Sequence, residues 1–470
     1  MGFHLNLAKF ETWWPSGTNA FSELPPEVKR CSEGIEILKL PLGSDSFIQG
    51  CLRKRVKQMT DILEQLETLE DSHIEFTILR ACLGAAKLTY SLRGLAPSQA
   101  VNTVMQEADE LIRRTLERIL GDSVDEQAWA QAGLAPSCAG LGLTHSADIS
   151  IPAFVGSVID TGALTLRMLQ TQSANVPGLQ DAAQRYINMG LGGHVPMNVG
   201  VVVGNLARDP LTAAATEDAP GKGQAALSEP IDAMRFDLLR QSVPGNDRDR
   251  LDACKRKHAA AWISCFPNKS LGLHLAPAEF QVACRYWLGM MNRAESRAVL
   301  KPGFAMYGRH HAIQECLLSL CQSSGVPARR EVLIDTSGQR PADVYLPNFH
   351  RGVPVAIDVT VSHPSQSRSI PGDDVTASQS ASVGAALAKV DAKTRKYKAQ
   401  CDARGVIFQA IAICSFGGWL QEGEELVKEL AARAASRGGS EPGIIVAQFW
   451  QRLSLALWRG NARQILHCLA

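Results

Sequence analysis

The stretch QRPADVYLPNFHRGVPVAIDVTVSHP, residues 339–364, contains two short β-branched and apolar runs joined by the turn-forming segment NFHRG. The runs VYL and VPVAIDVTV predict two strands of a hairpin, whose side chains alternate between two faces. Asp343 stands just before the first run, and Asp358 lies inside the second, 15 positions later. We expect such a hairpin to bring the two carboxylates close together.

The charge at Asp358 needs an explanation, because an ionised carboxylate in an apolar strand is costly unless it is paired, hydrogen-bonded or bound to a metal. Clustered carboxylates are hard oxygen ligands that suit Mg²⁺ or Mn²⁺, ions that normally keep several waters. A simpler interpretation is a Pro-Ala-Asp turn and a strand aspartate whose charge faces solvent or an arginine, since short acid pairs are common. The spacing leaves both interpretations open.

A basic helix, predicted over 380–403, directly follows the hairpin. It carries Lys389, Lys393, Arg395, Lys396 and Lys398. Packed against the sheet, one of these lysines would supply the cation with which a phosphodiester-cleaving site polarises the phosphate or the attacking water. The alternative is a solvated basic face without a ligand.

The predicted helix ahead of the hairpin opens with RHHAIQEC, residues 309–316. Glu315 lies one turn beyond His311 and is a candidate to complete a carboxylate cluster with Asp343 and Asp358. Adjacent histidines do not share one helix face, so His310 and His311 also fit a solvated helix start.

Composition is that of an ordinary globular protein. The 470 residues are 45% hydrophobic and 20% charged, enough for roughly three domains of about 150 residues. The net charge is +1, but residues 301–470 hold 19 Lys and Arg against 14 Asp and Glu, which makes the C-terminal third mildly basic. The 12 cysteines contain no CxxC pair and indicate a reduced intracellular chain. No apolar run approaches the roughly 20 residues of a membrane span, so we expect a soluble protein.

Periodicity divides the chain into a mostly helical part and a mixed C-terminal part. GIEILKLPLGS predicts one strand of about six residues, stopped by Pro41 and Gly43. Helices are predicted from Ser46 onward and over 72–92, 98–120, 146–170, 230–264 and 277–291, with irregular structure and a flexible connection over 171–225. The final part is predicted as helix 309–323, strands 331–335, 343–347 and 353–362, helix 380–403, strand 406–415, and helices 422–438 and 444–467.

Three glycine-containing segments resemble known sites only superficially. PGDD at 371–374 lacks the hydrophobic strand of a polymerase GDD motif. APGKGQ, around Lys222, lacks the first Gly and the Ser or Thr of a P-loop. MGLGGHVPMNVG lacks the strand, GxGxxG and helix order of a dinucleotide site. The sequence therefore predicts no nucleotide-binding fold from these segments.

Several ordered segments together resemble the end of the reverse transcriptase of non-LTR retrotransposons that carry a restriction-like endonuclease at the C-terminus. HLNLAKFETWWP resembles the last palm motif, ILKLPLGS the primer-grip hairpin, and LRACLGAAKLTYSLRGL with GLGLTHSADISIPAFVGS the thumb. AAAWISCFPNKSLGLHLAPAEFQVACRYWLGM resembles the linker of these elements. GRHHAIQECLLSL, QRPADVYLPN, VAIDVTV and KTRKYKAQC resemble the endonuclease in order and spacing.

The resemblance implies an α+β multidomain chain with a mostly helical thumb and linker and a C-terminal α/β nuclease-like domain of the PD-(D/E)xK type. The implied domains are the end of the palm at 1–45, a thumb-like region at 46–170, an irregular linker at 171–229, a helical linker at 230–300, and the endonuclease at 301–470.

The implied catalytic site consists of Asp343 and Asp358 as the acids that hold Mg²⁺ or Mn²⁺. Thr360 occupies the position of the usual lysine, two residues after the second acid, so the resemblance implies a lysine on the next helix, Lys396 first and Lys393 second. Glu315 matches an acid position on the first helix. The implied nucleic-acid contacts are Lys9, Arg53, Lys54, Arg55, Arg309, His310, Arg340, Tyr397 and Lys398.

Two family features are missing from the sequence. No YxDD motif is present, so this chain is not expected to polymerise DNA by itself, and an upstream polymerase fragment is an implied partner. Cys284 is followed by no cysteine before Cys316, so the Cys and His cluster that binds zinc in the family is not expected. The implied function is a truncated retrotransposon protein that nicks DNA in the nucleus, with target DNA and element RNA as partners and no membrane. The alternative is a nucleic-acid-binding remnant without catalysis, or a relic that folds only in part.

Overall fold

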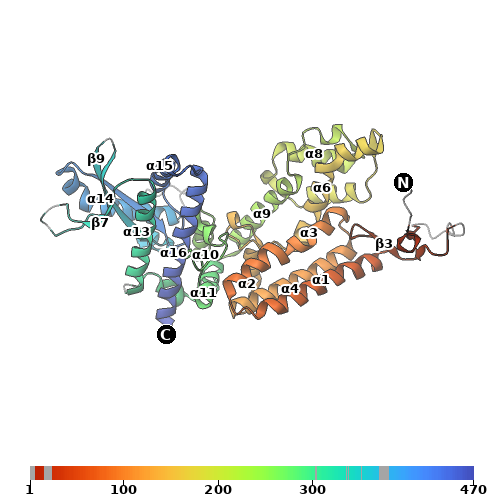
Figure 1. Ribbon diagram of the computed structural model, residues 1–470, viewed down its shortest axis with the longest axis horizontal. Coiled ribbons are helices and arrows are strands. Elements are labelled where there is room, and N and C mark those ends of the chain that lie inside the picture. The colour runs from red at the N-terminus through yellow and green to blue at the C-terminus, as the bar shows by residue number, and fades with distance from the viewer. Residues whose placement is uncertain are drawn as a thin grey trace. The chain divides into compact units, whose positions relative to one another are not determined.

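The computed structural model describes residues 6–14, 24–301, 304–334, 336, 338–350, 352–369 and 381–469. The chain is mostly helical with a small C-terminal sheet, in agreement with the predicted α+β class (Figure 1). It forms two compact units. The first consists of Met1–Glu70, Ile78–Leu116 and Leu143–Arg235, and the second of Asp71–Thr77, Glu117–Gly142 and Phe236–Ala470. The PGDD segment at 371–374 lies outside the described residues.

The first unit opens with short strands. β1 (Glu11–Trp13) pairs in parallel with β2 (Lys29–Cys31), and β3 (Gly34–Ile37) pairs with β4 (Leu40–Gly43) in an antiparallel hairpin. The single strand predicted over GIEILKLPLGS is thus two strands. Leu38 and Lys39 form the turn with φ of 51° and 65°, a conformation that usually requires Asn or Gly, so the sequence carried no turn signal there.

Among the residues that the structure describes, seven helices of nine residues or more belong wholly or mostly to the first unit. They are α1 (Asp45–Glu67), α3 (Ala85–Gly94), α4 (Gln99–Leu120), α6 (Ser146–Leu169), α7 (Leu179–Ile187), α8 (Met197–Arg208) and α9 (Gly223–Ser242). The helix predicted over 72–92 is interrupted: α2 (Ser72–Ile78) passes through a π-helical turn at Leu79–Leu83 before α3 begins. The helices predicted over 98–120 and 146–170 are confirmed.

Residues 171–229, predicted to be irregular, contain α7, α8 and the start of α9. The glycines and β-branched valines of MNVGVVVGN argued against a helix on propensity. Val199, Val202, Val203 and Leu206 are nevertheless buried on one face of α8, where they pack with residues of α6 and α7. Tertiary packing therefore overrides local propensity in this segment.

By length and composition, helix α6 is apolar enough to cross a membrane. The sequence predicted no such segment. However, 67% of its most apolar stretch is buried inside the protein. Ile151, Phe154, Val155, Ile159 and Leu166 belong to the hydrophobic core of the first unit. The burial is that of a core helix.

The second unit combines helices with the sheet. Besides α2, which belongs mostly to this unit, its helices are α5 (Glu126–Gly133), α10 (Gly245–Cys254), α11 (Pro277–Leu288), α12 (Arg293–Ala298), α13 (Phe304–Ser323), α14 (Ala381–Asp402), α15 (Gln421–Gly438) and α16 (Pro442–Leu469). The continuous helix predicted over 230–264 is broken between α9 and α10, where Pro244 stands at the N-cap of α10. Trp262, Trp287 and Trp458 are fully buried and lie in mutual ring contact.

The sheet has four strands in the order β10-β9-β8-β7. β7 (Arg329–Val332) and β8 (Ala342–His350) are antiparallel, β8 and β9 (Val353–Ser362) form the predicted hairpin, and β10 (Ile407–Cys414) runs parallel to β9. Helix α14 connects the two parallel strands, as parallel pairs require. The elements predicted from 309 to 467 are all present within a few residues.

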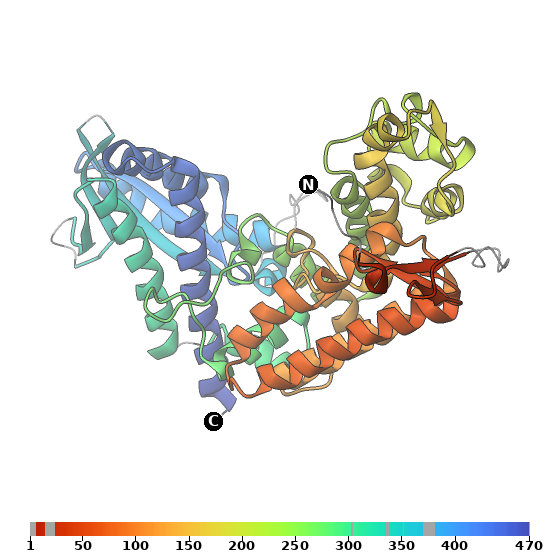
Figure 2. The same cartoon turned by 45° about the vertical axis from the view of Figure 1, so that its right-hand side comes forward.

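The two faces of the sheet are covered differently (Figure 2). Val355, Ile357 and Val359 of β9 point to one face and pack into the core formed by α13, α15 and α16. Ala356 points to the other face and packs with Cys401 of α14. Asp358 has the same strand parity as Ala356, so its carboxylate lies on the α14 face.

Candidate functional site

The register of the β8–β9 hairpin places the two acids side by side. Val344 is paired with Ile357, and continuing this antiparallel register by one residue sets Asp343 opposite Asp358. Directly opposite residues of an antiparallel pair have Cβ atoms about 5 Å apart on one face. The backbone N–H of Val359 donates to Asp343 Oδ2 at 2.7 Å, which holds that carboxylate against the neighbouring strand.

Lys393 of α14 forms an ion pair with Asp358. The Asp358 residue is only 2% exposed, and Lys393 Nζ lies 3.0 Å from its Oδ1 and 2.9 Å from its Oδ2. Oδ2 accepts no hydrogen bond of good geometry despite being buried. The carboxylate is therefore ion-paired, with one oxygen that still has hydrogen-bonding or ligating capacity.

Helix α13 supplies the other side of the cluster. His310 Nε2 lies 3.2 Å from Asp343 Oδ1. One turn further along, the buried Gln314 side chain donates to the backbone carbonyl of Asp343. Because His310 and Gln314 are four residues apart, they share a helix face, and both contact Asp343 of β8.

Burial and mutual charge set the protonation of this cluster. The pKa of Asp358 is raised from 3.8 to about 6, chiefly because burial disfavours its charged form; Lys393 opposes this and the charge of Asp343 adds to it. The hydrogen bond to Asp343 raises the pKa of His310 by stabilising the imidazolium. Burial thus favours the neutral form of Asp358, while the hydrogen bond from His310 to Asp343 favours the charged form of His310.

Two other predicted catalytic residues are placed differently. Lys396, the first choice for the catalytic lysine, has its Nζ 4.7 Å from the centroid of the Tyr397 ring and is exposed; among the described residues it forms no ion pair with Asp358. Glu315 is exposed and pairs with Arg330 of β7. Lys393, the second choice, is the lysine that reaches the acids.

The expected nucleic-acid contacts are scattered over both units. Lys9 and Lys54 are exposed, Arg53 pairs with Glu107 at 2.7 Å, and Arg55 bonds to Ser91 and to the Lys39 carbonyl.

In the second unit, Arg340 pairs with Glu331 and Lys398 with Asp402, each at 2.8 Å. Arg309 is buried: it donates to Asn461 Oδ1 at 2.6 Å, and burial lowers its pKa to about 10. Tyr397 is also buried, and its ring lies against Phe408. Arg309 and Tyr397 therefore lie in the protein interior, where they contact other parts of the second unit.

The donor atoms of the cluster fit a hard divalent cation better than zinc. Asp343 and Asp358 offer carboxylate oxygens, one of them the incompletely satisfied Oδ2 of Asp358. Mg²⁺ binds through one or two carboxylates and keeps water in its other positions, so two acids suffice. The part of the chain that the structure describes contains no group of three or more His, Cys, Asp or Glu able to hold a metal, so a cation at this site would depend on the two carboxylates and on water.

Sequence reasoning counted His310 only among nucleic-acid contacts and did not single out Gln314. His310 and Gln314 lie four residues apart on α13, the helix that precedes the hairpin in sequence. This spacing, which puts both side chains on one helix face, is the signal that points to them. No protein-family model matches the chain, and no curated protein matches it significantly in sequence. The candidate function consequently rests on the geometry of Asp343, Asp358, Lys393 and His310.

Proposed function

We propose that the second unit is a metal-dependent endonuclease that nicks DNA by hydrolysing one phosphodiester bond. The observation that carries the proposal is the convergence of Asp343 and Asp358, from the two strands of one hairpin, with Lys393 from the following helix. Two acids and a lysine on a small mixed sheet are the elements of a PD-(D/E)xK site. The lysine position on the helix replaces the strand position that Thr360 occupies.

In this proposal Asp343 and Asp358 hold Mg²⁺ or Mn²⁺. The bound cation would polarise the phosphate and lower the pKa of a coordinated water. Val359 N–H and His310 hold Asp343 in place from both of its oxygens. Removing both acids would leave the site without a ligand.

Lys393 has the second role. Its side chain is 32% exposed, so it lies at the boundary between the buried Asp358 carboxylate and solvent. A phosphate that approaches Asp358 meets this fixed positive charge, which stabilises the negative charge that develops as water attacks phosphorus. Hydrolysis breaks the P–O3′ bond, and the leaving oxygen takes up a proton to become a 3′-hydroxyl.

We further propose, from the sequence resemblance, that the chain is part of a non-LTR retrotransposon reverse transcriptase and endonuclease polyprotein. A nick with a free 3′-hydroxyl is the product that could prime reverse transcription. Target DNA, element RNA, a separate polymerase fragment and a nuclear location follow from the resemblance and belong to the same proposal.

A nicking assay on supercoiled plasmid tests the proposal. The wild-type chain should convert plasmid to the open-circular form with Mg²⁺ or Mn²⁺ and not with EDTA. Asp343→Ala should abolish the conversion, whereas Asp402→Ala, an exposed acid on α14 paired with Lys398, should not. Nicking that persists in Asp343→Ala would refute the assignment.

The same assay distinguishes the non-catalytic alternative. A nucleic-acid-binding remnant would retain salt-sensitive DNA binding that is unaffected by Mg²⁺ or by Asp343→Asn, and it would not cleave at any metal concentration. Limited proteolysis that leaves no stable fragment near residues 300–470 would instead indicate a partly folded relic.

A further inference from the structure

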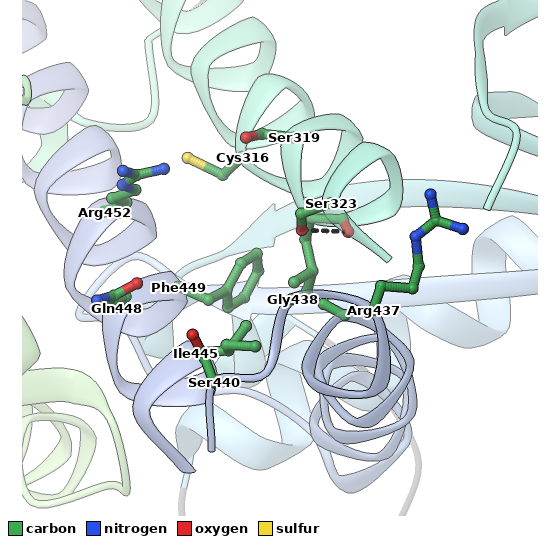
Figure 3. Close-up of a pocket in the computed structure, with 12 residues that line it drawn as sticks. Cys316, Ser319, Ser323, Arg437, Gly438, Ser440, Ile445, Gln448, Phe449 and Arg452 are labelled. Carbon is green, nitrogen blue, oxygen red and sulfur yellow. Dashed lines mark hydrogen bonds between the residues drawn. The ribbon is translucent and has the colours of Figure 1, made fainter. Parts of the chain in front are cut away.

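A second candidate site lies on the other side of the sheet, where α13, α15 and α16 meet. Residues of the three helices line an open pocket of about 470 Å³ (Figure 3). We call it the three-helix pocket; its polar lining includes Ser319, Ser323, Arg437, Gln448 and Arg452. Since α14 with Lys393 covers the opposite face, this pocket is separate from the acid cluster.

Two arginines give the three-helix pocket positive charge. Arg437 and Arg452 are both exposed and lie on opposite sides of the pocket, as Figure 3 shows. The pocket lining contains no carboxylate. Among the described residues neither guanidinium has a hydrogen-bond or ion-pair partner, in contrast to Arg433, which pairs with Glu429 at 2.6 Å on the same helix as Arg437.

The Arg437 guanidinium lies beside Gly325, just after the end of α13. Gly325 has φ of 70°, and a Cβ atom added there would lie 2.5 Å from Arg437 Nη1. Glycine suits the left-handed backbone at this position, and its missing side chain leaves space for the end of the flexible Arg437 side chain. The C-terminal end of α13 leaves room for this arginine side chain.

The surface between the two arginines is partly apolar. Phe449 and Leu320 line the pocket and are buried. Ile445, which lies near Phe449 in Figure 3, is half-buried. Ser323 donates its hydroxyl proton to the Leu320 carbonyl at 2.9 Å, while the exposed Ser319 stands at the rim. The pocket thus combines an apolar floor with two separated cations.

We propose that the three-helix pocket binds one nucleotide of a single nucleic-acid strand. The base would lie on the Phe449 and Ile445 floor, and the phosphates on either side of it would pair with Arg437 and Arg452. Guanidinium groups bind phosphate through paired hydrogen bonds, and single-strand sites combine backbone cations with apolar or aromatic surfaces under the bases. The volume lies within the range of pockets that enclose small ligands. Duplex DNA does not fit, because its bases are stacked and unavailable.

Fluorescence anisotropy with a short labelled oligothymidine and the full chain, in EDTA to prevent cleavage, tests this site. The variant Arg437→Gln/Arg452→Gln should bind about tenfold more weakly, and the slope of log affinity against log salt should fall by about 1.4, because two phosphate contacts on a single strand are lost. The control Arg404→Gln/Arg433→Gln removes two positive charges outside the pocket and should change affinity by less than about twofold. Equal effects of the two double variants would overturn the proposal.

A third variant tests the site by adding charge at an exposed position. Ser319→Glu should weaken oligothymidine binding about tenfold by repelling phosphate, and thermal melting should show that the variant folds. Thymidine monophosphate should compete better than inorganic phosphate. Competition by duplex DNA or by polyglutamate as strong as by oligothymidine would refute a single-strand site. The measurement needs no nicking activity, so its failure and that of the endonuclease proposal are distinguishable.

Discussion

Ile357 and Asp358 are neighbours in β9, yet they serve the two faces of the sheet in opposite ways. Ile357 is 1% exposed and packs into the core with α13, α15 and α16. Asp358 is 2% exposed and meets Lys393 on the α14 face. Nearly equal burial therefore has two meanings: on one face it stabilises the fold, and on the other it desolvates a charge. The comparison teaches that burial alone does not separate core from site, whereas the partner atoms do.

The largest expected effect concerns activity. Asp358→Ala should lower the nicking rate on supercoiled plasmid by about 10³-fold or more, because a charged ligand in a water-poor site is lost. Ile357→Val, which keeps the apolar packing one residue away, should nick at close to the wild-type rate. Comparable losses in the two variants would mean that the faces do not differ as described.

For stability we expect the opposite order: a change at Ile357 should be more damaging than a change at Asp358. Ile357→Ala should lower the free energy of unfolding by about 2–5 kcal/mol, since it leaves a cavity in a packed core. The measurement is urea unfolding followed by circular dichroism, with Val353→Ala at an exposed position of the same strand as the control. A loss below about 1 kcal/mol would contradict the core assignment of this face.

The two lysines of α14 sharpen the comparison on the site face. Lys393→Gln should reduce nicking by about 10²-fold, because the charge beside Asp358 is lost, whereas Lys396→Gln should reduce it by less than about threefold. Both variants lose one positive charge from the same helix, so general DNA affinity is matched. If Lys396→Gln is the more damaging change, the catalytic lysine is Lys396 and the ion pair with Lys393 is structural.

The pH dependence of stability gives a smaller effect with a definite sign. The folded-state pKa of Asp358, about 6, lies above the ordinary 3.8, so the folded chain binds this proton more tightly than the unfolded chain. The contribution of Asp358 to stability is therefore greatest below about pH 4 and is lost as the pH rises to about 6. Asp358→Asn should accordingly gain about 2–3 kcal/mol relative to the wild type between pH 4 and pH 7.

Urea unfolding of both proteins at the two pH values measures this gain. Asp402→Asn, an exposed acid on α14, should show no such pH-dependent gain. A variant that becomes less stable than the wild type as the pH rises would mean that the Lys393 ion pair outweighs the desolvation of Asp358.

Strand period and turn residues made the hairpin predictable. Alternating apolar residues in VPVAIDVTV and a turn signal in NFHRG were sufficient to predict β8, β9 and the proximity of Asp343 to Asp358, although residues 348–350 of the predicted turn belong to β8. The β3–β4 hairpin and α8 were missed for one reason: Leu38, Lys39 and the valines of α8 adopt conformations that local propensity disfavours. Packing against residues distant in sequence stabilises the valines of α8. Leu38 and Lys39 are exposed, and their carbonyls accept hydrogen bonds from Tyr90 and Arg55.

The sequence by itself determined the α+β class, the elements of the C-terminal sheet and the two acids, because side-chain periodicity and burial cost are local properties. Only the tertiary structure decided which lysine reaches Asp358, since Lys393 and Lys396 differ by less than one helical turn and their roles depend on how α14 rests on the sheet. It also decided that His310 joins the cluster while Arg309 is buried against Asn461. Such choices depend on helix rotation and on contacts between distant segments, which a linear pattern does not encode.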